Sequence, residues 1–152
     1  MSGTLRVHEI YLSLQGESTF AGLPCVFIRL TGCDLRCSYC DTAYAFTGGE
    51  KLTLDSVLKQ TMALAEGYPE PPLVELTGGG EPLLQKETPT LLAALADRGF
   101  TVLLETSGAH DISGVDARVH RIVDLKCPSS GESERNLPDN LHHLRASDEV
   151  KC

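Results

Sequence analysis

Three cysteines within eight residues are the strongest chemical signal in the sequence. Cys33, Cys37 and Cys40 are spaced Cys-x-x-x-Cys-x-x-Cys. Three thiolates on one short loop can converge on a soft metal centre, because thiolate selects zinc, copper(I) or an iron–sulfur cluster over magnesium or calcium. A structural zinc site needs four protein ligands, and no second Cys or His pair follows the triplet. The spacing therefore favours a four-iron cluster in which one iron has no protein ligand and can bind a small molecule.

The remaining cysteines do not indicate a disulfide framework. The 152 residues contain 6 cysteines, which are few and clustered, and no signal peptide precedes them. Cys25 lies in an apolar run and is expected to be a small buried hydrophobe. Simple packing and a zinc site are the alternatives for the triplet. This cysteine usage predicts a cytoplasmic protein.

Arg29 is the charged residue of an otherwise apolar strand predicted from Pro24 to Thr31. A guanidinium group enters a core only with a partner, because its desolvation is expensive. Arg29 therefore pairs with a carboxylate of the protein or binds one from a ligand. A planar guanidinium group suits bidentate carboxylate binding, and the strand leads straight into residues 32–42, which carry the three cysteines and are called the cysteine loop below. We therefore favour the carboxylate of a ligand as the partner of Arg29.

A run of glycines follows another predicted strand, in the sequence Thr77-Gly78-Gly79-Gly80-Glu81-Pro82. Glycines let backbone amides and carbonyls approach a ligand closely. The run matches neither the dinucleotide fingerprint nor the P-loop. By itself it is equally a tight turn.

Hydrophobic periodicity predicts the elements that position these residues. Alternation from Val7 to Leu14 indicates a half-buried strand. A helix is expected from Leu54 to about Glu66, capped by Thr53, and a second from Thr88 to Gly99. Further apolar strands are predicted at 73–77, 100–106 and 121–125. This order of strands and helices indicates a parallel α/β fold, which places its sites where strands end.

The composition bounds the class of protein. A chain of 152 residues, 41% of them hydrophobic, is expected to form one domain with a real core. The net charge of −8 argues against nonspecific nucleic-acid binding, which needs a basic face. No run of 18 apolar residues exists, so no membrane span is predicted.

The C-terminal part is polar. Leu137, Leu141 and Leu144 have helical spacing, and His142 and His143 are expected at the surface. Residues 148–152 resemble the start of another strand. We therefore expect that the chain lacks its final C-terminal elements.

The cysteine spacing, with Tyr39 just before the third cysteine, resembles the signature of the radical S-adenosylmethionine (SAM) enzymes. Within that superfamily, the stretches Leu14 to Glu17, Phe27 to Cys33 and Cys40 to Thr42 resemble the 7-carboxy-7-deazaguanine synthases of queuosine and 7-deazapurine biosynthesis. The similarity runs with interruptions from about residue 9 to residue 149. It implies a partial, curved parallel (β/α) barrel and one radical SAM core domain over residues 1–152.

The resemblance also implies three sets of site residues. The metal ligands would be Cys33, Cys37 and Cys40 for a [4Fe–4S] cluster and Thr42 for Mg²⁺. The SAM contacts would be Tyr39, Cys40, Asp41, Gly79, Gly80, Glu81, Cys127, Pro128 and Ser129. Three glycines stand where many relatives have two, so either Gly79 or Gly80 would make the SAM contact. The substrate contacts would be Leu14, Gln15, Gly16, Glu17, Arg29, Thr77 and Glu105, and no general base is evident.

The implied reaction is the ring contraction of 6-carboxy-5,6,7,8-tetrahydropterin with loss of ammonia. A reduced cluster would cleave SAM to a 5′-deoxyadenosyl radical that takes a hydrogen atom from the substrate, after which SAM is regenerated. The implied partners are an electron donor such as flavodoxin or ferredoxin and a second copy of the chain in a homodimer. One alternative is an activase of glycyl-radical enzymes. Two features argue against it, namely Arg29 and the stretch Leu14 to Glu17. A non-enzymatic iron–sulfur or zinc module is the other, although electron carriers usually have four cysteine ligands.

Overall fold

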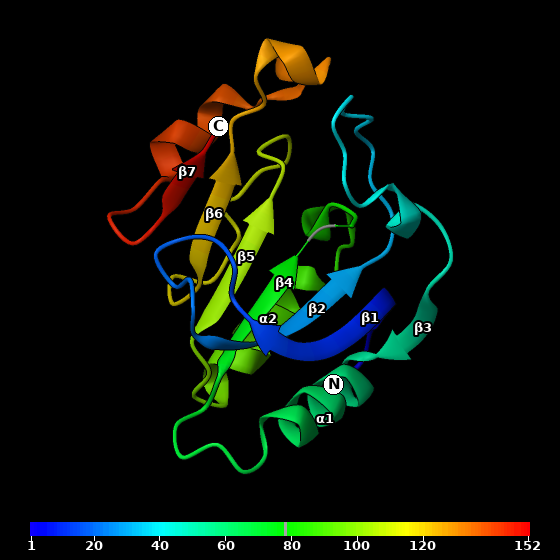
Figure 1. Ribbon diagram of the computed structural model, residues 1–152, viewed down its shortest axis with the longest axis vertical. Helices are drawn as coiled ribbons and strands as arrows, with labels where there is room; N and C mark the ends of the chain where they lie inside the picture. Colours follow the sequence, from blue (N-terminus) through cyan, green and yellow to red (C-terminus); the bar gives the residue numbers. More distant parts are fainter. Residues whose placement is uncertain (78) are drawn as a thin grey trace.

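One mixed sheet forms the centre of the molecule. The computed structural model describes residues 1–77 and 79–152. In these residues seven strands pair in the order β3-β1-β2-β4-β5-β6-β7 (Figure 1). The bounds are β1 (Thr4–Leu14), β2 (Pro24–Leu30), β3 (Glu50–Thr53), β4 (Leu73–Thr77), β5 (Val102–Thr106), β6 (His120–Asp124) and β7 (Glu149–Lys151).

The strands from β2 through β7 in this order are parallel, as an α/β barrel requires. The predicted α/β fold is thereby confirmed. At the other edge, β1 runs antiparallel to both β2 and β3. Neither this antiparallel pairing nor β3 was predicted from the sequence. The connection from β1 to β2 is short and contains no crossover helix, which suits antiparallel strands.

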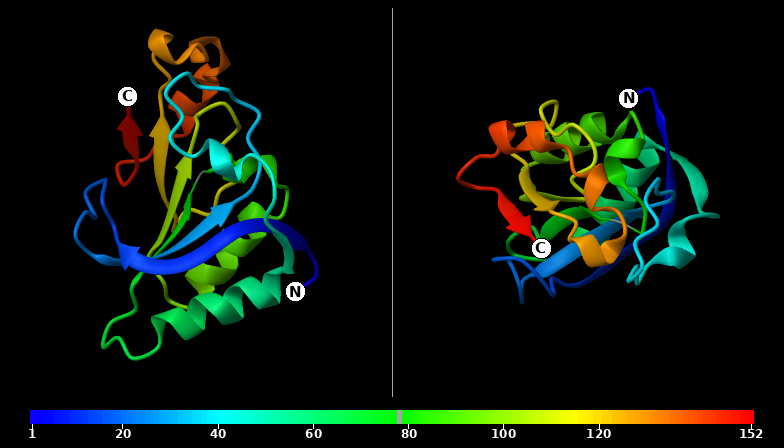
Figure 2. Two further views of the ribbon diagram at one scale, coloured as in Figure 1. Left: turned by 45° about the vertical axis from the view of Figure 1, so that its right-hand side comes forward. Right: turned by 90° about the horizontal axis from the view of Figure 1, so that it is seen from above.

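Two helices, α1 (Leu54–Ala65) and α2 (Thr88–Asp97), cover one face of the sheet (Figure 2). The hydroxyl of Thr53 accepts a hydrogen bond from the Ser56 N–H, which confirms the predicted cap of α1. Pro89 lies in the first turn of α2, where its missing N–H has no helical partner in any case. Most of the hydrophobic core lies between these helices and the sheet.

Alternation along the parallel strands sends neighbouring side chains to opposite faces. On β2, Val26 and Ile28 enter the core beneath the helices, whereas Cys25 and Phe27 belong to a smaller apolar cluster on the other face. Cys25 is fully buried, as predicted. Arg29 follows Cys25 and Phe27 in this alternation, so its side chain lies on the face of the sheet away from the helices.

The segment from residue 132 to 148 contains short 3₁₀ helices in place of the helical stripe suggested by its leucines. They are η4 (Ser133–Arg135) and η5 (Pro138–His143), after η1 (Ala43–Ala45), η2 (Pro82–Leu84) and η3 (Pro128–Ser130) earlier in the chain. Leu141 is 63% exposed, so no stripe exists for a longer helix to bury. His142 and His143 lie at the surface, and β7 confirms the strand expected at residues 148–152.

No helix among the described residues combines the length and apolar character that crossing a membrane would require.

Candidate active site

A cavity of about 530 Å³ opens at the carboxyl ends of the parallel strands. Figure 1 shows the connections after β2, β4, β5 and β6 rising together at this end of the sheet. Most of the residues that the sequence analysis assigned to the site line this cavity: Gln15, Gly16, Glu17, Arg29, Cys33, Cys37, Tyr39, Cys40, Asp41, Thr42, Thr77, Gly79, Gly80, Glu81 and Glu105.

Four assigned residues do not line the cavity. Leu14 is 63% exposed, at the end of β1. Cys127, Pro128 and Ser129 lie where the chain packs against the cysteine loop. Their predicted contacts with substrate and SAM remain predictions.

The cysteine loop follows β2 and is fastened to the segment after β6. The N–H of Ser38 donates to the carbonyl of Ser130 at 2.9 Å, and its hydroxyl donates to the carbonyl of Ser129 at 2.6 Å. The N–H of Arg36 donates to Glu132 at 2.6 Å. The segment 128–132 therefore supports the loop from outside the cavity.

The three cysteines of the loop fit an iron–sulfur cluster by their chemistry and placement. All three are free thiols, partly buried, and line the same cavity. In the described part of the chain no three His, Cys, Asp or Glu side chains meet closely enough to hold a single metal ion. In a cluster each cysteine binds a different iron, so the sulfurs need not converge on one point. Burial raises the pKa of the Cys33 and Cys37 thiols, so metal binding there releases protons.

Gly79 and Gly80, called the glycine loop below, lie against the cysteine loop with no space for side chains. A Cβ on Gly80 would stand 2.0 Å from the carbonyl oxygen of Gly32, and one on Gly79 would stand 2.3 Å from the Cβ of Ala45. The N–H of Glu81 donates to the same Gly32 carbonyl at 2.8 Å. Both glycines are therefore required by packing, whichever of them contacts a ligand. Gly78 lies outside the described residues.

Glu81 is 1% exposed, and its carboxylate connects the segment after β4 to the end of β5. Its oxygens accept hydrogen bonds from the Thr106 hydroxyl at 2.8 Å, the Ser107 N–H at 2.6 Å and the Leu83 N–H at 3.0 Å. The structure thus gives Glu81 a role in holding the glycine loop to the end of β5.

Arg29 pairs with a carboxylate of the protein, the first of the two alternatives that its burial required. Its Nε lies 2.7 Å from Oε1 of Glu9, and its Nη2 donates to the Tyr11 hydroxyl at 2.9 Å. The guanidinium lies 5.9 Å from the ring centre of Tyr44. It also lines the cavity, so a ligand carboxylate can still reach it.

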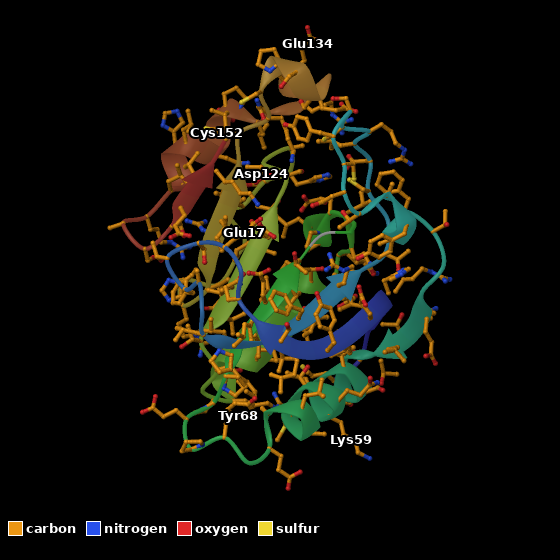
Figure 3. The ribbon with its side chains drawn as sticks, in the orientation of Figure 1. Glu17, Lys59, Tyr68, Asp124, Glu134 and Cys152 are labelled. Carbon is orange, nitrogen blue, oxygen red and sulfur yellow. The ribbon has the colours of Figure 1, made fainter. Side chains whose placement is uncertain are left out.

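A second group of polar and charged side chains lines the cavity beside Arg29, on the strands β4, β5 and β7. The Thr77 hydroxyl donates to Glu105 at 3.0 Å. Lys151 donates to the other oxygen of Glu105 at 2.9 Å and also to Glu17. Lys126 pairs in the same way with Asp124. Figure 3 labels Glu17 and Asp124 near the middle of the view and Tyr68 near its lower end.

Sequence reasoning missed several residues of the cavity wall, chiefly Glu75, Lys151 and Asp124. Glu75 is 4% exposed, and burial, followed by the nearby charge of Glu105, raises its pKa to about 7. The signal that could have found it is the one used for Arg29, a charged residue within an apolar strand.

Comparison with known proteins agrees with this arrangement. Residues 27–129 match the family model described as the radical SAM superfamily. The 7-carboxy-7-deazaguanine synthase of Koribacter versatilis is 46% identical over 148 residues, which cover 97% of this chain and 63% of that protein. The enzyme of that name from Chlorobaculum tepidum is 50% identical, covering 90% of this chain and 60% of that protein. The enzyme of that name from Thermoplasma acidophilum is 37% identical, and the match covers 95% of this chain and 68% of that protein.

A solved structure agrees as well. The crystal structure of QueE from Escherichia coli superposes with a TM-score of 0.76 at 26% identity, covering 91% of this chain and 67% of that one. The chain spans 63% and 60% of the length of the first two relatives. By these matches and by its site residues, the chain belongs to the radical SAM superfamily and, within it, to the family of the 7-carboxy-7-deazaguanine synthases.

Proposed function

We propose that the chain forms the catalytic core of a 7-carboxy-7-deazaguanine synthase, which contracts the ring of 6-carboxy-5,6,7,8-tetrahydropterin with loss of ammonia. The observation that carries this proposal is the shared cavity: the three cysteines, the glycine loop and Arg29 line one space of about 530 Å³. A cavity of this size lies within the usual range for small-molecule sites. The family membership supports the same reaction.

In this proposal Cys33, Cys37 and Cys40 hold a [4Fe–4S] cluster, and SAM lies along the glycine loop. When bound, the two groups supply the one-electron cleavage chemistry that starts the ring contraction. The protein contributes position and shielding. The close contact of Gly80 with Gly32 fixes the distance between the glycine loop and the cysteine loop, and thus between their two ligands.

The substrate is held by the strand ends. Arg29 receives the substrate carboxylate, sharing its guanidinium with Glu9. Thr77, Glu105 and Gln15, which line the same cavity, then orient the ring system. The ion pairs of Lys151 keep the Glu105 side chain in place before substrate arrives.

We propose in addition that the hydroxyl of Thr42 would serve as a ligand for Mg²⁺ when the substrate is bound. The Thr42 hydroxyl lines the cavity 3.8 Å from the sulfur of Cys40. One hydroxyl is a weak ligand for this ion, so oxygen atoms of the substrate and water must complete the shell. Thr42→Val should then abolish the stimulation of turnover by Mg²⁺ and leave cluster assembly unchanged.

The remaining features follow the family resemblance. We propose a flavodoxin or ferredoxin as electron donor, a homodimer and a cytoplasmic location.

Product analysis after reconstitution tests the proposal. The protein is loaded anaerobically with iron and sulfide, reduced, and incubated with SAM and 6-carboxytetrahydropterin. Mass spectrometry should find 7-carboxy-7-deazaguanine and intact SAM. Cys37→Ala should lose the cluster and the product, whereas Cys152→Ala, at an exposed cysteine outside the cavity, should retain both.

The contrary outcomes are specific. Formation of 5′-deoxyadenosine without the deazaguanine product would refute the proposed substrate and favour an activase. Failure of well-folded protein to assemble any cluster would refute the radical SAM reading of the cysteines.

A further inference from the structure

The cavity is lined by more carboxylates than the proposed reaction requires: Glu17, Asp41, Glu75, Glu81, Glu105 and Asp124. Most of them are already compensated by the protein. Glu17 and Glu105 share Lys151, and Asp124 pairs with Lys126. Glu81 accepts three hydrogen bonds from the chain, and Asp41 is exposed to water. This leaves Glu75.

Glu75 is a buried carboxyl without a cation. It is 4% exposed, and no Lys or Arg of the described residues forms an ion pair with it. Its neighbours at the same level of the sheet are apolar, Phe27 on β2 and Leu103 on β5. A carboxylate in such surroundings needs hydrogen-bond donors, because its desolvation is costly.

Gln15 holds the carboxyl of Glu75 in a fixed orientation. The side-chain amide of Gln15, itself 4% exposed, donates to Oε2 of Glu75. The amide oxygen of Gln15 accepts from the N–H of Glu17 at 3.3 Å, which fixes which end of the amide faces Glu75. The side chain of Thr77 is a second hydrogen-bonding neighbour of this carboxyl. A carboxylate has about four acceptor positions, so these two contacts leave capacity for further donors.

Glu75 lies in the wall of two adjoining cavities. Two cavities of about 530 and 520 Å³ meet at a shared set of residues that includes it. On β4 it lies two residues before Thr77, which pairs with Arg29 in the sheet. Two residues of a strand span about 7 Å, the scale of a fused two-ring heterocycle. A ligand bound at Arg29 by one end can therefore reach Glu75 with the other.

We propose that Glu75 determines substrate specificity by accepting the N–H groups of the 2-amino-4-oxopyrimidine edge while the substrate carboxylate meets Arg29. This inference rests on the proposed function and names the residue that recognises the other end of that substrate. The 2-amino group and N3 present two nearly parallel N–H donors. They match the two oxygens of a carboxylate in the way that a guanidinium does.

Compensation by Lys151 makes Glu17 and Glu105 weaker candidates for this contact. Burial raises the pKa of Glu75 to about 7, and two ligand N–H groups would stabilise its ionised form. A ligand that lacks one donor leaves a buried acceptor unsatisfied. A site that accepts a hydrogen bond from each of the two N–H groups therefore binds an analogue without one of them much more weakly.

A pair of ligands tests the inference. Lumazine-6-carboxylate carries a carbonyl oxygen where pterin-6-carboxylate has its 2-amino group, so it loses one donor and turns an acceptor toward Glu75. Dissociation constants are measured for both on the reconstituted protein with SAM. The wild type should bind the pterin at least tenfold more tightly than the lumazine. In Glu75→Gln, which keeps the shape but replaces one acceptor by a donor, the preference should fall below threefold.

The controls separate recognition from general damage. Glu70→Gln makes the same charge change on an exposed loop and should keep the wild-type preference. Glu75→Leu should lose the preference as well, which secures the result if the Gln variant folds poorly. Circular dichroism checks the fold of each variant.

Two results would overturn the inference in different ways. If Glu75→Gln keeps the preference and Glu105→Gln loses it, the pyrimidine edge is recognised by Glu105. If the folded wild type binds neither ligand and forms no deazaguanine product, the proposed function itself fails. If the wild type converts 6-carboxytetrahydropterin to the deazaguanine product and both Glu75 variants keep the wild-type ligand preference, the inference alone is refuted.

Discussion

Arg29 and Glu75 are charged side chains within apolar strands, and both turn away from the helix-covered face toward the cavity. Their partners differ. Arg29 has Glu9 within 2.7 Å, whereas Glu75 has the uncharged amide of Gln15. The cost of an uncompensated charge should therefore be measurable at Glu75 even without any ligand.

We expect Glu75→Gln to remove a pH-dependent loss of stability. The folded pKa of about 7 lies above the ordinary value of 4.5, so folding favours the protonated form. The associated stability is complete below about pH 4.5 and is lost as the pH rises through 7. Between pH 4.5 and 8 the wild type should lose about 3 kcal/mol relative to the variant. Urea unfolding at several pH values measures this difference.

The surroundings of Glu75 support the sign of this prediction. Cys25 on β2 keeps a neutral thiol, its pKa raised to about 12 by burial and by the charge of Glu75. Glu105 and Glu17 carry negative charges that oppose ionisation, and Lys151 is engaged with both of them. A difference curve that stays flat over this pH range would contradict the assignment of a raised pKa to Glu75.

At the scale of elements, the cysteine loop is held by contacts from three other connections. The glycine loop after β4 touches it through Gly80 and Gly32. The connection after β5 reaches it through His110, which lies 3.1 Å from Asp34, and the segment after β6 reaches it through Arg135, at 2.7 Å from the same carboxylate. These contacts within the protein orient the loop.

Gly80→Ala should disturb the contact between the two loops. The new Cβ would stand 2.0 Å from the Gly32 carbonyl oxygen, so one backbone must move. We expect a loss of about 3 kcal/mol in unfolding free energy, as for other overpacked sites. Gly114→Ala is the matched control, because its Cβ would enter open space, and it should change stability by less than about 0.5 kcal/mol. Equal stability of the two variants in urea would contradict the packing argument.

Asp34→Ala should loosen the cysteine loop. Without the contacts of Asp34 with His110 and Arg135, the free energy of opening the cysteine loop should fall by about 1 kcal/mol. The open form of the loop would then be populated about fivefold more. Trypsin should then cleave after the exposed Arg36 about fivefold faster, as peptide mapping can follow. Asp97→Ala breaks an exposed ion pair with Arg118 elsewhere and should leave this rate unchanged. Unaltered cleavage in Asp34→Ala would show that the other contacts suffice to hold the loop.

At the scale of the whole molecule, a buried ion pair ties the last strands to the body of the protein. The side chains of Arg121 on β6 and Asp148 before β7 are 0% and 1% exposed. Arg121 also donates to the carbonyls of Ile112 at 3.1 Å and of His143. One guanidinium on β6 therefore joins the connection before this strand to the connection that leads on to β7.

Arg121→Met should cost about 3–5 kcal/mol of stability, because it leaves the Asp148 carboxylate buried and unpaired. The double variant Arg121→Met with Asp148→Leu should be more stable than the sum of the single changes predicts, by at least about 2 kcal/mol. Denaturant unfolding of the four proteins gives this coupling. Additive losses would show that the two side chains do not interact.

Features that depend only on neighbours along the chain could be predicted from the sequence. The spacing of Cys33, Cys37 and Cys40 indicates the kind of metal centre without reference to the fold. The cap at Thr53 and the end of β4 at Thr77 follow from local hydrogen bonds and from a short apolar run, and the structure confirms both. Such signals act over a few residues, so one sequence contains all of them.

The tertiary structure decided which distant groups share the cavity. Lys151 meets Glu17 across 134 positions of sequence, and Glu75 joins the wall because β4 lies between β2 and β5. Cys127 to Ser129 lie beside the cysteine loop rather than in the cavity. These outcomes depend on strand order and on desolvation in three dimensions, and neither has a local pattern in the chain.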